Sequence, residues 1–271
     1  MILNLEPGLT IGYNKRAVAT LTENLAFQAG QVSLLLGLNG QGKTTLMKTL
    51  ARLLPPVTGK VARTRVLYLS DDVDFPANLT PIEIVNSIAP TPIVRGCGLE
   101  MLEDLEVENK RYGVLSKGNR QKARIVFGEV GARSRNVNFL GMDEPFAGLD
   151  FQAREYLASR WLQYTDQDRH LLVSMHPSEI PVQPSQILLV SQGQIWTVPP
   201  STPWAEIRAT LGKPKEVPAP AGEPVRGSQA APRVLAVARP QGVFLTSDHP
   251  EEDEHTVGSR GQHDEKVGSK Q

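Results

Sequence analysis

The chain has one cysteine, no net charge and no long apolar run. The single cysteine among its 271 residues, Cys97, cannot form an internal disulfide or a thiolate metal cage, which suits a reducing compartment. The 29 basic and 29 acidic side chains balance, so no overall field attracts nucleic acid or anionic lipid. No run reaches the ~20 apolar residues that span a bilayer, and the N-terminus lacks a signal-peptide pattern. These absences predict a soluble, cytosolic protein, and no nucleic-acid partner is expected.

The remaining composition is typical of a globular protein, and its patterning predicts an α/β core. Short apolar runs alternate with turns near the N-terminus, and a buried strand is predicted over 31–36. A strand, a helix and a strand are predicted at 137–142, 152–164 and 170–175. This alternation is typical of a parallel sheet with helices on its faces.

The segment between these parts favours a small helical subdomain at about 73–130. A strand is predicted before it at 61–70, and its helices are expected at 80–88 and 99–107, separated by a loop at 89–98. A hairpin of 186–190 and 194–198 and a short helix at 203–211 follow. The compact domain is therefore expected to span residues 1–212.

Residues 213–271 differ from the rest in composition. Prolines recur between Lys213 and Pro240, and Asp, Glu, His, Gly and Ser dominate the end of the chain. Such a segment buries too little apolar surface to offset its ordering entropy, so most of it is expected to be disordered. A small hairpin at 233–246, docked on the core or on a partner, is the alternative for one part. Three irregularly spaced histidines, His249, His255 and His263, are interpreted as solvated side chains rather than metal ligands.

A glycine-rich loop lies between the predicted strand at 31–36 and a helix predicted over 44–54. It matches the phosphate-loop pattern, in which two glycines spaced by four residues precede Lys-Thr. Glycines let backbone N–H groups turn toward phosphate oxygens, and the next helix adds its positive N-terminal end. Lys43 then supplies a charge to the β- and γ-phosphates of ATP, and the Thr44 hydroxyl binds Mg²⁺. The residues expected to bind nucleotide here are Asn39, Gly40, Gln41, Gly42, Lys43, Thr44 and Thr45.

Two adjacent carboxylates follow the apolar strand predicted at 137–142. Open α/β sheets bind ligands at the ends of such strands, although an Asp-Glu pair alone is more often the solvated start of a loop. Together with the phosphate loop, the pair favours catalysis. Asp143 would hold Mg²⁺ through water, and Glu144 would orient and polarise the attacking water.

Three further motifs appear in the order typical of the ABC ATPase family, which the sequence therefore resembles. Leu115-Ser116-Lys117-Gly118-Asn119 is similar to the family signature, Gly148-Leu149-Asp150 to its D-loop, and His176 to its switch histidine. The resemblance implies a P-loop NTPase core with an N-terminal antiparallel β subdomain and a small helical subdomain. It also implies that Tyr13 stacks on the adenine ring.

The resemblance further implies that two subunits meet head to tail around two nucleotides. Ser116, Gly118 and Asn119 of one subunit would cover the γ-phosphate held by the other, and Asp150 would reach across the dimer. His176 would contact the γ-phosphate and the attacking water and so join Glu144 and Lys43 in catalysis. The signature serine also has the simpler role of a helix cap.

Two departures from the family pattern affect particular assignments. Asp71 stands where the Q-loop glutamine is usual, and it is kept as a candidate ligand of Mg²⁺. Lys117 and Asn119 replace a glycine and a glutamine of the signature. This form resembles that of ATPases paired with ABC-2-type exporters.

By resemblance, the chain is expected to be an ATPase subunit that powers a separately encoded membrane transporter, with a bias toward export. Its partners would be a second ATPase subunit, identical or related, and an integral membrane permease. It would lie in the cytoplasm, peripheral on the inner face of the cell membrane. One alternative is a soluble ABC ATPase of DNA repair or translation, which the short stretch between Lys43 and Ser116 disfavours. A P-loop kinase or GTPase is the other, and no guanine-recognition motif supports it.

Overall fold

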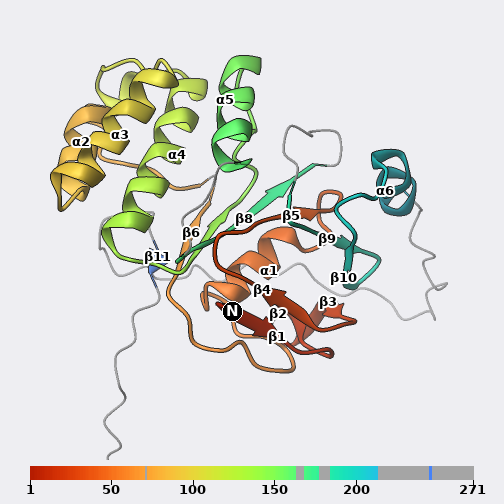
Figure 1. Ribbon diagram of the computed structural model, residues 1–271. Coiled ribbons are helices and arrows are strands. Elements are labelled where there is room, and N and C mark those ends of the chain that lie inside the picture. Colours follow the sequence, from red (N-terminus) through yellow and green to blue (C-terminus); the bar gives the residue numbers. More distant parts are fainter. Residues whose placement is uncertain (71, 163–167, 177–183, 213–243, 246–271) are drawn as a thin grey trace, which may run out of the picture.

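The computed structural model describes residues 1–70, 72–162, 168–176, 184–212 and 244–245. A large twisted sheet runs through the molecule beside a separate pair of strands, β1 (Leu3–Leu5) and β4 (Leu25–Phe27) (Figure 1). Listed across the large sheet, its strands are β11 (Phe244–Leu245), β6 (Val66–Leu69), β7 (Phe139–Met142), β8 (His170–Met175), β5 (Val32–Leu36), β9 (Gln186–Ser191), β10 (Gln194–Val198), β3 (Arg16–Leu21) and β2 (Thr10–Tyr13).

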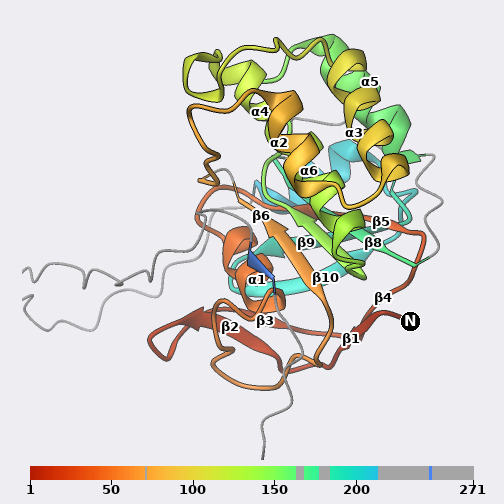
Figure 2. The ribbon, with the colours of Figure 1, turned by 90° about the vertical axis from the view of Figure 1, so that its left-hand side faces the viewer.

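Helices cover both faces of this sheet. They are α1 (Lys43–Leu50), α2 (Pro81–Ile88), α3 (Pro92–Asp104), α4 (Lys117–Ser134), α5 (Phe151–Leu162) and α6 (Trp204–Leu211), with a 3-10 turn at Tyr112–Val114. Helices α2 to α5 gather on one side, whereas α1 and the N-terminal strands lie on the other (Figures 1 and 2). Among the described residues, no helix is both long enough and apolar enough to cross a bilayer.

The centre of the sheet is parallel, which brings two loops to one edge. Strands β6, β7, β8, β5 and β9 pair in parallel, and β9 then turns back into antiparallel β10. Because the carboxyl ends of parallel strands meet at the same edge, the loops after β5 and β7 open side by side. The fold thus confirms the predicted α/β class.

Alternate residues of the central strands supply two separate cores. Leu34 and Leu36 of β5 pack with the helices of the α2 to α5 side, whereas Leu35 packs with α1 and the N-terminal strands. These strands are buried on both faces and therefore form continuous apolar runs rather than alternating patterns. For this reason the apolar runs at 31–36, 137–142 and 170–175 could be predicted as strands from the sequence.

The loop predicted over 89–98 is wrong, because α3 begins at Pro92. Thr91 caps this helix by accepting a hydrogen bond from the Val94 amide, and proline at the first helical position suits the start of a helix. The glycines of this segment suggested a break. A Cβ at Gly98, however, would lie 2.6 Å from Val130 Cγ2, so this glycine permits close packing of α3 on α4.

Other element boundaries differ from the predicted ones by a few residues. β6 begins at Val66 rather than at 61, and α1 ends at Leu50 rather than at 54.

Two residues of the C-terminal segment form an edge strand of the sheet. Phe244 and Leu245 pair antiparallel with Tyr68 and Leu67. The other arm of the hairpin expected at 233–246, and the rest of 213–271, lie outside the described residues.

A buried histidine at the start of β8 is neutral at physiological pH. His170 Nδ1 donates to the Gln28 carbonyl at 2.7 Å, and Nε2 lies 3.0 Å from Ser33 Oγ. The ring stacks on Phe139 and meets Phe27 edge-on. Burial lowers the pKa of His170 from 6.5 to about 4, although the Gln28 carbonyl opposes the shift.

This depressed pKa predicts that acid weakens the fold through His170. The unfolded chain binds the proton near pH 6.5 and the folded chain only near 4. The stabilisation is therefore fully present above pH 6.5 and is lost as the pH falls toward 4, up to about 3 kcal/mol. We expect His170→Gln to unfold in urea with a free energy that falls less between pH 6.5 and 4.5 than that of the wild type. An equal fall in both proteins would contradict the prediction.

Candidate functional site

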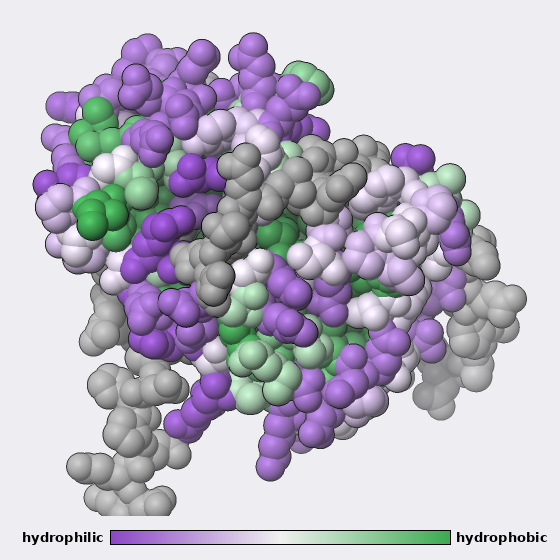
Figure 3. Space-filling view, viewed as in Figure 1, coloured by the Kyte–Doolittle hydropathy of each residue, from purple (hydrophilic) through white to green (hydrophobic). Residues whose placement is uncertain are grey.

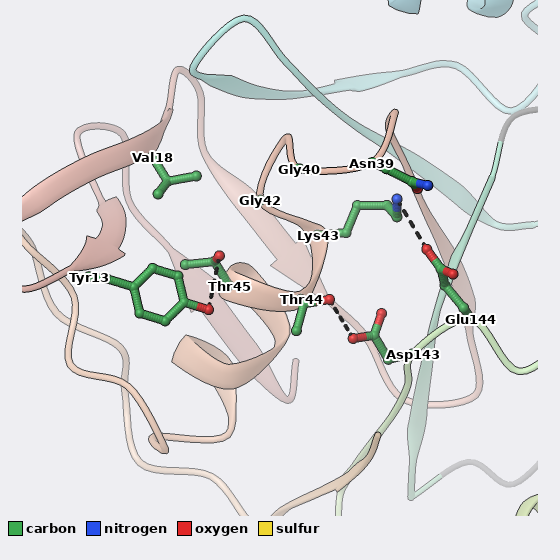
Figure 4. A pocket seen from close by; sticks show the side chains of 10 residues that line it. All are labelled: Tyr13, Val18, Asn39, Gly40, Gly42, Lys43, Thr44, Thr45, Asp143 and Glu144. Atoms are coloured by element: carbon green, nitrogen blue, oxygen red, sulfur yellow. Dashed lines mark hydrogen bonds and ion pairs between the residues drawn. The ribbon is translucent and has the colours of Figure 1, made fainter. Parts of the chain in front are cut away.

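A pocket of about 430 Å³ opens where the phosphate loop meets the end of β7. Its walls come from the β2–β3 hairpin, from the loop and first turn of α1, and from the residues after β7 (Figure 4). The lining residues are Tyr13, Val18, Asn39, Gly40, Gly42, Lys43, Thr44, Thr45, Asp143 and Glu144. All but Val18 are residues for which the sequence predicted a role.

The phosphate loop uses its glycines where the backbone is left-handed. Gly40 and Gly42 have φ of 78° and 116°, which side chains other than glycine rarely adopt. A Cβ at Gly42 would also lie only 2.9 Å from Val18 Cγ1. Gly42 is the N-cap of α1 and offers no side chain to its first N–H groups. Free N–H groups and the helix dipole at such a terminus suit an anion.

Lys43 is held at the centre of this site. Its side chain is only 5% exposed, and Nζ donates to the Gly37 carbonyl at 2.9 Å. Nζ also lies 3.3 Å from Glu144 Oε1, so the ammonium group already faces a carboxylate inside the pocket (Figure 4). An anion that enters can compete for the same ammonium group.

Asp143 accepts hydrogen bonds from three hydroxyl groups. Thr44 Oγ1 donates to Oδ2 at 2.7 Å, Tyr68 OH donates to the same oxygen at 2.9 Å, and Ser174 Oγ donates to Oδ1. The Thr44 hydroxyl donates its hydrogen bond to the carboxylate, so the lone pairs of its oxygen remain for a cation. A hydroxyl oxygen beside a carboxylate is a donor set that suits Mg²⁺, and Thr44 and Asp143 therefore fit the expected metal.

Glu144 turns sharply out of the strand end. Its φ is 47°, an uncommon value for a residue with a side chain, and its backbone N–H donates to Ser174 Oγ at 2.9 Å. The carboxylate is 41% exposed on the pocket wall. The Glu144 side chain is thus open to water, while the backbone of this residue is held by a hydrogen bond.

The β2–β3 hairpin provides the opposite wall of the pocket. The Tyr13 ring lies beside Val18, and Thr45 Oγ1 donates to the Tyr13 hydroxyl at 3.4 Å (Figure 4). An exposed aromatic face with an aliphatic neighbour suits a flat base. Gln41 does not line the pocket, because its Oε1 accepts from the Gln192 amide at 3.1 Å.

The signature and the D-loop contact each other rather than the pocket. Ser116 caps α4 by accepting from the Asn119 amide at 3.1 Å. A Cβ at Gly118 would lie 3.3 Å from the Gly148 carbonyl oxygen. Asp150 forms an ion pair with Lys122 of α4 at 2.6 Å, and the hydrogen bond from Lys122 is the main reason why its pKa is lowered.

Several predicted site residues therefore do not line this pocket in the single chain. Ser116, Gly118, Asn119 and Asp150 lie on the α4 side, and none of them is among its lining residues. His176 directly follows β8 and is also not among the residues that line the pocket. Asp71 lies outside the described residues.

The sequence did not reveal three contributors to the site. Tyr68 and Ser174 sit inside apolar strands, where a hydroxyl carries no motif, and Val18 belongs to an unremarkable strand. The one available signal was a polar residue within a strand next to the carboxylate strand. Such a residue is buried on both sides and therefore needs a hydrogen-bond partner.

A family model described as "ABC transporter" matches residues 22–147, a segment that holds the phosphate loop, the signature and both carboxylates. The chain is 27% identical over 192 residues to the manganese transport system ATP-binding protein MntB of Listeria monocytogenes, covering 62% of this chain and 78% of that protein. It is 30% identical over 203 residues to the human ATP-binding cassette sub-family A member 2, covering 67% of this chain.

The extent of these matches differs greatly. The chain spans only 8% of the length of the human sub-family A protein and of its rat relative. Among solved structures, an ATP-binding subunit of an ABC transporter aligns with a TM-score of 0.63 at 20% identity, covering 79% of this chain and 100% of that one. At that identity the likeness shows the fold. Taken with the family match and the geometry of the pocket, it shows that this chain carries the ATPase domain of the ABC transporter family.

Proposed function

We propose that the chain binds and hydrolyses MgATP and thereby powers a membrane transporter whose permease is a separate protein. The observation that carries this proposal is the convergence, in one pocket, of Lys43 and Thr44 with Asp143 and Glu144. An anion site, a cation site and a carboxylate open to water are the three elements that phosphoryl transfer to water requires.

Different residues of the pocket bind different parts of MgATP. Tyr13 and Val18 receive the adenine ring, and the N-terminus of α1 receives the phosphates. Lys43 leaves Glu144 and donates to the β- and γ-phosphate oxygens. Thr44 and Asp143 would hold Mg²⁺, and the bound ion would supply positive charge against the phosphates during transfer.

Catalysis follows from the release of Glu144 by Lys43. Once Lys43 has turned to the phosphates, the Glu144 carboxylate is free to orient a water molecule and to accept its proton. His176, at the end of the neighbouring β8, assists by contacting the γ-phosphate and the water. Nucleotide binding and activation of the carboxylate are thus coupled through one ion pair.

The active form is proposed to be a head-to-tail dimer that encloses two nucleotides. This proposal is supported by Ser116 at the N-terminus of α4, which is exposed, and neither Ser116 nor Gly118 lines the chain's own pocket. The helix N-terminus there would complete the partner subunit's site. Closure on ATP and reopening after hydrolysis provide the conformational stroke.

The helical subdomain offers a surface for the permease. A cleft of about 280 Å³ between α2 and α3 is lined by Pro81, Ile82, Leu99, Leu102, Glu103, Val107 and Asn109. Figure 3 shows apolar patches over α2 and α3 among hydrophilic neighbours. A short permease helix would bury this surface. The Ser116-Lys117-Gly118 form of the signature favours an exporter as the transporter served.

Membrane association tests this part of the proposal. We expect the full chain, isolated from the cells that produce it, to sediment with membranes and to co-purify with an integral membrane protein. Ile82→Glu, in the cleft, should lose membrane association while retaining ATP binding. Ile93→Glu is the matched control, because Ile93 is exposed on α3 outside the cleft. Recovery of the wild type only as a free soluble protein would contradict the proposal and favour a soluble ABC ATPase.

A further inference from the structure

Two hydroxyl groups donate hydrogen bonds to the Asp143 carboxylate from the strands on either side of β7. Tyr68 belongs to β6 and Ser174 to β8, and both strands pair with β7, the strand that ends before Asp143. Tyr68 OH donates to Asp143 Oδ2 at 2.9 Å, and Ser174 Oγ donates to Oδ1. Both side chains are fully buried, so neither is available to solvent.

We propose that Tyr68 and Ser174 form a hydroxyl clamp that positions Asp143 for the metal and Glu144 for the attacking water. Neither residue touches nucleotide or metal in this account, so both are positioning residues. The inference rests on the proposed ATPase function and assigns roles within that same site.

The need for the clamp follows from the burial of Asp143. Its carboxylate is removed from bulk water and requires donors on both oxygens to offset lost hydration. Thr44 is one such donor, but its hydroxyl oxygen must also face the metal. The clamp adds one donor to each carboxylate oxygen, and the two donors come from strands on opposite sides of β7. Groups of this kind around a metal ligand set its orientation and affinity.

Ser174 also contacts the backbone of Glu144. Its Oγ accepts the Glu144 backbone N–H at 2.9 Å, at the residue where φ is 47°. A side-chain-bearing residue holds that conformation only when its surroundings favour it. The hydrogen bond therefore keeps the Glu144 carboxylate near Lys43, within 3.3 Å of Nζ. Ser174 thus positions the Asp143 carboxylate and the backbone of Glu144, whereas the Tyr68 hydroxyl is bonded to Asp143.

This difference predicts two separable effects. Tyr68→Phe removes one hydrogen-bond donor to Asp143 and keeps the ring. The Mg²⁺ concentration at which the ATP analogue is half-maximally bound should therefore rise about tenfold, with little change in kcat at saturating Mg²⁺. Ser174→Ala should produce a similar rise and also lower kcat at saturating Mg²⁺ by at least about tenfold, because Glu144 loses its backbone anchor. Ser174→Thr keeps the hydroxyl and should restore most of the Mg²⁺ affinity and most of kcat.

The experiment titrates Mg²⁺ into the purified full chain with a fluorescent ATP analogue, with kcat and KM measured on the same samples. Tyr112→Phe is the matched control, because Tyr112 is buried in the helical subdomain core and should leave both quantities unchanged. Thermal unfolding of each variant reports whether the fold is intact. If Ser174→Ala fails to fold, Tyr68→Phe still decides whether the clamp holds Asp143 for the metal.

The possible results separate the clamp from the function on which it rests. Unchanged Mg²⁺ dependence in folded Tyr68→Phe would overturn the clamp while leaving the ATPase intact. Equal kcat in wild type and folded Ser174→Ala would overturn the anchoring of Glu144. A wild-type chain that binds no ATP analogue at any Mg²⁺ concentration would refute the proposed function, and the clamp with it.

Discussion

Glu144→Gln is expected to lower ATP turnover by at least a hundredfold while ATP binding remains. The amide has nearly the shape of the carboxylate but cannot accept a proton from water, and general bases contribute about 10²- to 10⁴-fold. It also cannot form the ion pair with Lys43 at 3.3 Å, so Lys43 is freer to meet the phosphates. Phosphate release and equilibrium binding of ATP, measured on one preparation, check the two halves of the prediction.

The same variant should accumulate as an ATP-dependent dimer, because closed sites no longer reopen through hydrolysis. Gel filtration with and without MgATP measures this. Glu155→Gln, an exposed carboxylate on α5, serves as the control and should match the wild type in all three assays. Near-normal hydrolysis in Glu144→Gln would remove Glu144 from the catalytic role.

Lys43→Met should weaken ATP binding by roughly ten- to a hundredfold. Methionine can fill the buried space of the lysine stem, so the main loss is a charged donor to the phosphates, which typically contributes about 1.5 to 3 kcal/mol. The Gly37 carbonyl also loses its 2.9 Å partner, which loosens the start of the loop. Titration with a fluorescent ATP analogue measures the change in affinity.

A second lysine of the same helix provides the comparison. Lys48 lies in the last turn of α1, away from the pocket lining, and Lys48→Met should bind ATP as the wild type does. Equal affinity of Lys43→Met and Lys48→Met would show that the phosphates are bound elsewhere. Because both variants exchange a lysine of α1 for methionine, a difference between them reports on the position of the lost charge rather than on the exchange itself.

Most of the pocket could be predicted from the sequence, for a physical reason. Strand ends in a parallel sheet meet at one edge, so an apolar run followed by Gly37 and another followed by Asp143 had to bring their loops together. The glycines of the loop are required by left-handed backbone at Gly40 and Gly42. The observed pocket joins both loops as the patterns indicated.

The features that escaped prediction depend on packing across the sheet. Gly98 resembled a loop residue, but it is a contact point between α3 and α4. Tyr68 and Ser174 resembled ordinary strand residues, because nothing local shows that β6 and β8 flank β7. Helical and strand periodicity describes which face a residue occupies and not which neighbour it meets.

The signature shows a different limit of the single chain. The motif at Ser116 to Asn119 was placed by resemblance beside a γ-phosphate, whereas in this chain it contacts Glu108 and the D-loop region. A site shared by two subunits would leave the motif away from its own pocket. The arrangement agrees with the proposed dimer and explains why Ser116 and Lys43 do not line one cavity.

Phosphate release from ATP by the purified wild-type chain, measured across a Mg²⁺ titration, tests the central claim most directly. Turnover is expected to depend on Mg²⁺, to saturate with ATP and to rise more than linearly with protein concentration as dimers form. Binding of the nucleotide without any phosphate release, at protein concentrations where dimers are present and with the permease added, would contradict it.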